Sequence, residues 1–185
     1  TELYAYVAFL VIILTYGLET AFFRFSQKDN DVKVVYSTTL ISLIVSSIIF
    51  VILMFISSSE IANWMGYAGH TEYIQWFAII IALDAISSIS FAKLREQNKA
   101  TRFVIIRLIN IFVNIGLNIF FIVYKEYGIE YIFISNLISS IVTIALLFPE
   151  MLTSVWSFDK ILWKKMMIYA LPLLIAGLAG MTNET

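Results

Sequence analysis

Long apolar runs alternate with short polar segments along the chain, and the runs have the length of membrane-spanning helices. A helix needs about 20 mostly apolar residues to cross a bilayer. Five runs meet this requirement, and a sixth reaches the end of the sequence: 3–23, 36–57, 73–92, 103–124, 131–148 and 166–185. Backbone groups in lipid must be hydrogen-bonded within the protein, which favours helices, and these runs are too long for strands. The pattern therefore predicts an all-α, polytopic membrane helix bundle.

Composition supports lipid as the solvent and excludes several classes of site. The chain of 185 residues is 61% hydrophobic and 14% charged, whereas soluble domains are about 45–50% apolar and about 25% charged. It has no cysteine, which excludes disulfides and thiol chemistry, and no basic tract that would indicate a nucleic-acid partner. The one histidine, His70, lies in a polar stretch and is interpreted as a loop residue. Since no catalytic set or phosphate-binding loop is visible, we expect no cofactor and no enzyme activity.

Lysine and arginine are distributed asymmetrically between the predicted loops. Ten of the twelve basic residues fall in three segments, 24–35, 93–102 and 150–165, and basic loops face the cytoplasm. These segments are therefore predicted to be cytoplasmic. The segment 151–165 mixes basic and bulky apolar residues at helical spacing. Either it lies flat on the inner membrane surface, or it is the start of the sixth helix.

A polar stripe runs along the fourth apolar run. Arg107, Asn110, Asn114 and Asn118 follow one another at steps of three, four and four residues, so they project within roughly 80° of each other on a helix. A cation at membrane depth costs several kcal/mol, and the amides need partners too. The amides alone fit hydrogen bonding between helices. Because Arg107 shares their face, we favour a water-filled cavity in which these side chains bind a polar substrate.

Two acidic residues lie within other apolar runs. Asp84 is at a depth similar to that of Arg107, and we hypothesise that the two form an ion pair or share a polar site. The alternative is that Arg107 reaches to the inner membrane surface. Glu19 and Asp84 are candidates for coupling to a cation or proton. The third and fifth runs also carry weaker polar stripes: Ser88, Arg95, Asn136, Ser139, Ser140 and Thr143.

Two stretches resemble a known family of transporters. "YGLETAFFRFSQKD" and "SFAKLREQNKATRFVIIRLINIFVNIGLNIFFI" are similar to polysaccharide flippases of the Wzx type, in the multidrug/oligosaccharidyl-lipid/polysaccharide exporter superfamily. The resemblance implies two six-helix lobes around a cavity, with the chain as a fragment. It would hold the first lobe without its first helix, the cytoplasmic connection 151–165 between the lobes, and a truncated helix of the second lobe at 166–185. It also implies that Arg107 and Arg24 hold a diphosphate and that the asparagines bind sugar hydroxyls.

These observations predict a flippase for undecaprenyl-diphosphate-linked oligosaccharides in the bacterial inner membrane, serving polysaccharide or O-antigen export. Its partners would be the lipid-linked substrate, membrane lipids and polysaccharide-assembly proteins. Three alternatives stay open. Two are transporters of the same superfamily, a cation-coupled multidrug exporter and a peptidoglycan-precursor flippase. The third is a membrane scaffold or sensor anchor without transport.

Overall fold

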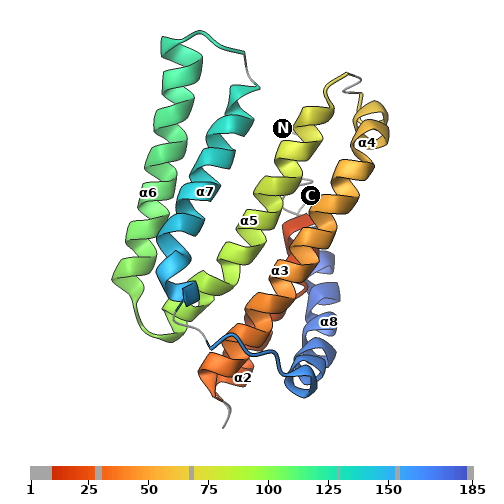
Figure 1. Ribbon diagram of the computed structural model, residues 1–185, viewed down its shortest axis with the longest axis vertical. Coiled ribbons are helices and arrows are strands. Elements are labelled where there is room, and N and C mark those ends of the chain that lie inside the picture. Colours follow the sequence, from red (N-terminus) through yellow and green to blue (C-terminus); the bar gives the residue numbers. More distant parts are fainter. Residues whose placement is uncertain (1–9, 28–30, 67–68, 129, 153–154, 183–185) are drawn as a thin grey trace.

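The protein is a bundle of helices joined by short connections (Figure 1). The computed structural model describes residues 10–27, 31–66, 69–128, 130–152 and 155–182, and these ranges contain no strand. The elements in chain order are α2 (Leu18–Ser26), α3 (Val32–Ile56), α4 (Ser58–Trp64), α5 (Thr71–Glu96), α6 (Ala100–Asn118), the π-helix η1 (Ile119–Tyr124), α7 (Tyr131–Leu152) and α8 (Lys160–Thr182). Within these ranges, four helices are long and apolar enough to cross a membrane: α3, α5, α6 continued by η1, and α7. The predicted all-α, polytopic membrane bundle is confirmed.

Helix α5 is the central element of the bundle. It packs against α2, α3, α6 and α7, and Figure 1 shows it between α3 on one side and the α6–α7 hairpin on the other. The outer face of α6 is different, because apolar side chains such as Leu108 and Phe112 are exposed there. Such a large exposed apolar face fits contact with lipid acyl chains. The α6–α7 hairpin therefore has one side toward α5 and one toward the membrane.

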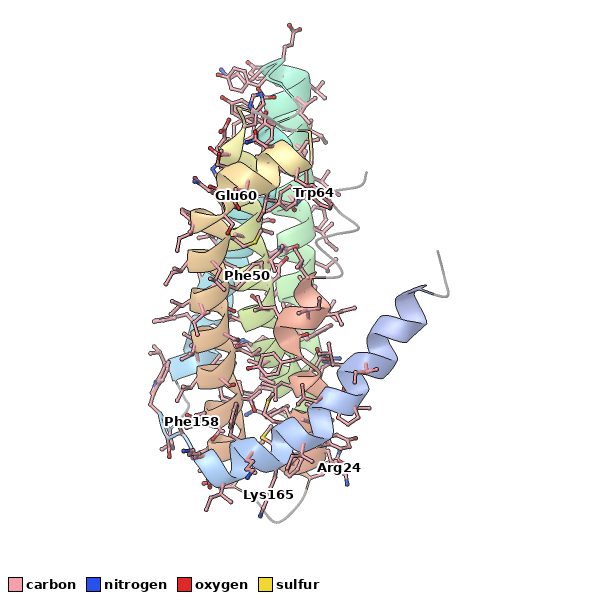
Figure 2. All side chains as sticks on the ribbon, turned by 90° about the vertical axis from the view of Figure 1, so that its right-hand side faces the viewer. Arg24, Phe50, Glu60, Trp64, Phe158 and Lys165 are labelled. Atoms are coloured by element: carbon pink, nitrogen blue, oxygen red, sulfur yellow. The ribbon has the colours of Figure 1, made fainter. Side chains whose placement is uncertain are left out.

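Most of the basic residues fall at one end of the bundle. In Figure 2, Arg24 and Lys165 lie at this end, whereas Glu60 and Trp64 of α4 lie at the other. The connection between α5 and α6 is at the same end as α2, the helix that contains Arg24 (Figure 1). The described parts of the three basic segments therefore meet at one end of the molecule. Assignment of this end to the cytoplasm stays a prediction.

The first apolar run is broken where the sequence predicts one continuous helix over 3–23. Residues 10–15 are helical, and α2 begins only at Leu18; residues 3–9 lie outside the described ranges. Between them, Tyr16 and Gly17 have φ angles of 34° and 71°, which is left-handed backbone that glycine adopts without a steric cost. A Cβ on Gly17 would lie 2.8 Å from the backbone oxygen of Ala170 in α8. The glycine thus permits both the break and the close approach of α8.

The boundaries around the connection between α7 and α8 also differ from the predicted ones. Helix α7 continues to Leu152, past the predicted end at residue 148, and α8 begins at Lys160 instead of 166. Asp159 explains the earlier start, because its Oδ1 accepts hydrogen bonds from the backbone N–H of Ile161 (2.8 Å) and Leu162 (2.9 Å). A carboxylate in this position caps a helix N-terminus. Within the segment 151–165, residues 160–165 belong to α8, whereas residues 155–159 are not helical; the position of this segment relative to the membrane surface stays a prediction.

Candidate functional site

A polar cavity of about 290 Å³ lies between α5, α6 and α7. Val11, which precedes the helix break at Tyr16 and Gly17, also lines this cavity. Apart from Val11 and Phe91, every lining side chain is polar or charged: Asp84, Ser87, Ser88, Arg107, Asn110, Asn136, Ser139, Ser140 and Thr143. All of these come from helices that are apolar enough to cross a membrane. The cavity therefore gathers the polar groups of three helices whose other faces are largely apolar.

The two charged residues of the cavity lie well inside the membrane-spanning helices. Asp84 precedes the end of α5 at Glu96 by roughly 18 Å, and Arg107 follows the start of α6 at Ala100 by roughly 10 Å, at about 1.5 Å per helical residue. A charge at such a depth is tolerated when it faces protein, water or a polar ligand. Both side chains meet this condition because both line the cavity.

Asp84 and Arg107 share the cavity without forming a direct ion pair. Asp84 Oδ1 accepts a hydrogen bond of 2.9 Å from Ser140 Oγ. The Arg107 guanidinium carbon instead lies 4.2 Å from the centre of the Phe91 ring, and within the described ranges no carboxylate lies within 4.0 Å of its nitrogens. The structure thus places both residues in the lining of one cavity without an ion pair between them, and a shared function of the two stays a prediction.

The Ser87 hydroxyl is a feature of the cavity that the sequence analysis missed. Ser87 is 3% exposed, and its Oγ has no hydrogen-bond partner among the described residues. A buried hydroxyl without a partner costs about 1–3 kcal/mol, so this group favours water or a polar ligand in the cavity. Its spacing was the available signal, because Ser87 follows Asp84 by three residues and so shares its helix face.

Asn110 belongs both to the cavity and to the contact between α6 and α7. Its Nδ2 donates to Thr143 Oγ1 at 2.8 Å and to the backbone oxygen of Ser139 at 3.2 Å. Arg107 and Asn110 are thus the members of the predicted stripe that line the cavity. The amide of Asn110 is already partly satisfied by α7, which fixes its orientation.

The remaining members of the stripe lie outside the cavity lining. Asn114 Nδ2 donates to Asn136 Oδ1 and, at 3.3 Å, to Ser139 Oγ, and Asn118 Nδ2 donates to Asn114 Oδ1 at 2.8 Å. The bonds of Asn114 reach α7 and are helix-to-helix contacts of the kind that polar residues form in membranes, whereas the bond of Asn118 lies within α6. The stripe is therefore divided: Arg107 and Asn110 face the cavity, Asn114 joins α6 to α7, and Asn118 bonds to Asn114. A role of Asn114 and Asn118 in substrate binding stays a prediction.

Residues 3–185 match the sequence model of a family described as "Polysaccharide biosynthesis protein". The chain belongs to this family. Neither a curated protein nor a solved structure matches it. Together with its four membrane-spanning helices, the match makes the chain a multi-pass membrane protein of polysaccharide biosynthesis. The resemblance seen in the sequence is confirmed at this level.

In this polysaccharide biosynthesis protein, Glu19 and Arg24 lie away from the polar cavity. The Glu19 carboxylate forms an ion pair with Arg95 of α5, and the Arg24 guanidinium carbon is 4.1 Å from the centre of the Tyr169 ring of α8. Neither residue is part of the cavity lining. Arg24 as a substrate ligand and Glu19 as a coupling residue stay predictions, and the structure does not bring them together with Arg107.

A buried carboxylate at the basic end holds the connection between α5 and α6 against α7. Glu150 is 4% exposed, and its oxygens lie 2.9 Å from Arg102 Nη1 and 3.8 Å from Lys99 Nζ. Lys93 Nζ donates to the Glu150 backbone oxygen at 2.6 Å and lies 4.1 Å from the centre of the Tyr36 ring. We call these four charged residues the Glu150 cluster. The Glu150 cluster thus fixes the basic end of α5, α6 and α7, and the polar cavity lies between the same three helices.

The Glu150 cluster was not predicted, since Glu150 follows Lys93 by 57 positions and only the fold brings the two together. Nothing in the spacing of these residues signals the contact. The described ranges also hold no group of three or more histidine, aspartate or glutamate side chains placed for a metal ion. The chemistry that the cavity offers is therefore that of hydrogen bonding and of one cation facing one anion.

Proposed function

We propose that this protein moves lipid-linked oligosaccharide repeat units, carried on undecaprenyl diphosphate, across the bacterial inner membrane. One observation carries the proposal: a charged and hydrogen-bonding cavity lies at membrane depth in a protein whose family concerns polysaccharide biosynthesis. Such a cavity would be costly in lipid if it held nothing polar. A substrate with a polar head and a long apolar tail matches the bundle, because the head can bind in the polar cavity and the tail can lie against the exposed apolar face.

The lining side chains have the donors and acceptors that this headgroup requires. A guanidinium binds phosphate oxygens through two parallel N–H groups, and Arg107 is the cation of the cavity. Amides and hydroxyls both donate and accept, as sugar hydroxyls do, and Asn110, Ser87 and Asn136 supply them. A volume of about 290 Å³ takes only part of such a headgroup. In the two-lobed arrangement that the resemblance implies, the second lobe supplies the rest.

The proposed transport is a movement without chemical conversion. The headgroup enters the cavity from the basic, cytoplasmic end while the lipid tail remains among the acyl chains outside the bundle. Rocking of the two lobes then opens the cavity to the opposite side, as in other transporters built from repeated units. The exposed apolar face of α6, which includes Phe112 at 73% exposure, gives the tail a continuous lipid path.

Substitution of Arg107 tests the proposal in cells that depend on the complete protein. Arg107→Ala removes the charge-assisted contact with phosphate, at a cost of about 1.5–3 kcal/mol or roughly 10- to 100-fold in affinity. We expect less surface polysaccharide, and accumulation of its lipid-linked precursor in the cytoplasmic leaflet, at an unchanged amount of protein in the membrane. Arg107→Lys should restore activity only in part, because lysine lacks the planar fork.

Lys125, an exposed cation outside the cavity, provides the control. Lys125→Ala should leave polysaccharide export at the wild-type level. If Arg107→Ala also leaves export and precursor levels unchanged, the cavity does not hold the headgroup and the proposal is wrong. Accumulation of a peptidoglycan precursor instead of the polysaccharide precursor would identify a different lipid-linked substrate.

A further inference from the structure

We propose that Phe91 is a positioning residue that holds the Arg107 guanidinium ready for an oxyanion of the substrate headgroup. This inference rests on the proposed function. The Arg107 guanidinium carbon lies 4.2 Å from the centre of the Phe91 ring and 5.9 Å from that of Phe103. Phe91 comes from α5 and Arg107 from α6. The contact therefore joins two of the helices that form the cavity, and both residues line it.

The contact uses one part of the guanidinium and leaves another part free. A cation is attracted to the negative face of an aromatic ring, and a guanidinium stacks with its flat face while its five N–H donors stay in its plane. No carboxylate of the described ranges lies within 4.0 Å of the Arg107 nitrogens, and the Arg107 side chain is exposed. The donors are therefore available to a ligand that approaches through the cavity.

Phe91 is itself held firmly in place. It is 2% exposed, and it packs in a cluster with Leu94, Ile106 and Leu147. The Phe103 ring meets it edge-on, with centroids 5.3 Å apart and planes at 75°. A ring fixed in this way limits the rotamers of an arginine stacked on it. Less conformational entropy is then lost when the arginine binds its ligand.

Phe91 also keeps Arg107 available in the presence of Asp84. Both charged groups line the same cavity, and opposite charges in a site of low dielectric attract each other strongly. An ion pair between them would occupy the donors that the oxyanion needs. Asp84 accepts its hydrogen bond from Ser140, while the Arg107 guanidinium lies over the Phe91 ring. With separate partners, the two charged groups do not form an ion pair.

Stepwise fluorination of Phe91 tests this inference. Mono-, di- and trifluorophenylalanine, introduced in the complete protein in cells, keep nearly the size of the ring but weaken the negative charge of its face. Since a cation–π contact at an exposed site is weaker than a desolvated one, we expect export to fall in steps, to roughly one-half to one-fifth of wild type with the trifluoro residue. Precursor accumulation should rise in parallel, at an unchanged amount of protein in the membrane. Packing alone would give no such trend.

Phe22 is the matched control, because it is fully buried and its ring lies against the rings of Phe23 and Tyr36. Fluorination there should leave export unchanged. A flat response at Phe91, or an equal decline at Phe22, overturns the role of Phe91. If Arg107→Ala impairs export in the same cells, the proposed function survives that result. If Arg107→Ala has no effect, the proposed function fails first, and the role of Phe91 fails with it.

Discussion

Arg107 and its neighbours show how a polar residue is accommodated at membrane depth. The sequence predicts a single stripe of Arg107 and three asparagines, and the periodicity is correct. The structure divides the stripe, because Asn114 bonds to α7 and Asn118 bonds to Asn114, while Arg107 and Asn110 line the cavity. Sequence spacing gives the face of a helix but not the partner across it. The identity of that partner decides whether an amide joins helices or meets a ligand.

At the same scale, the Glu150 cluster leads to a prediction about stability. Glu150→Gln removes the carboxylate that Arg102 and Lys99 contact and leaves the cations facing one another. A hydrogen bond to a charged group contributes about 1.5–3 kcal/mol, so we expect a loss of stability of about that size. Thermal unfolding of the purified complete protein in detergent, followed by tryptophan fluorescence, measures it.

The control for Glu150→Gln is Glu126→Gln, at an exposed position in the connection after η1. Its unfolding temperature should stay within the error of the wild-type value. Equal unfolding temperatures for the Glu150 variant and the wild type would show that the carboxylate contributes nothing net. The attachment of α5 to α7 would then rest on the hydrogen bond of Lys93 to the Glu150 backbone oxygen and on packing.

Among the elements, the interrupted helix before α2 differs most from its prediction. Hydropathy predicts a continuous helix over 3–23, since Glu19 is the one charged residue of that run. The break coincides with the close approach of Gly17 to the backbone of Ala170, and Ala170 lies 153 positions later. The exact boundaries of α7 and α8 were beyond the sequence for a similar reason: capping by Asp159 starts α8 within a stretch that hydropathy treats as a loop.

Gly17→Ala tests the account of the helix break. The methyl group would meet the Ala170 oxygen at 2.8 Å, and the residue would have to keep a φ of 71°, which costs about 1–2 kcal/mol for an L-residue on its own. We expect a lower unfolding temperature in detergent and a loss of export.

Gly116→Ala is the matched control, because nothing lies within 4 Å of its Cβ position. Since alanine favours helix, that variant should be as stable as wild type or more stable. Equal stability of the two variants would contradict the proposed reason for the break.

At the scale of the whole molecule, the sequence predicts the class of fold and the separation of charge, because both follow from transfer between water and lipid. The four long helices and the common basic end both follow this logic. The cavity was predicted only in outline. Asp84, Arg107 and the polar stripes of α5 and α7 were recognisable by spacing, and Ser87 could have been found in the same way from its distance of three residues to Asp84, whereas Phe91 could not. An aromatic ring in an apolar run looks like any other core residue until a cation is found on its face.

The central claim is that water and a polar ligand reach the space between α5, α6 and α7. These 185 residues contain no cysteine, so a thiol introduced at one position is the only one in this part of the protein. Ser87→Cys and Asn110→Cys place a thiol on two walls of the cavity, and Ile111→Cys places one on the neighbouring outer face, where the isoleucine is 48% exposed.

The measurement is the rate of reaction with a charged thiol reagent that does not cross membranes, in vesicles of each orientation. We predict fast modification of S87C and N110C and slow modification of I111C. Slow modification of all three, or modification of I111C as fast as that of the cavity variants, would contradict the account.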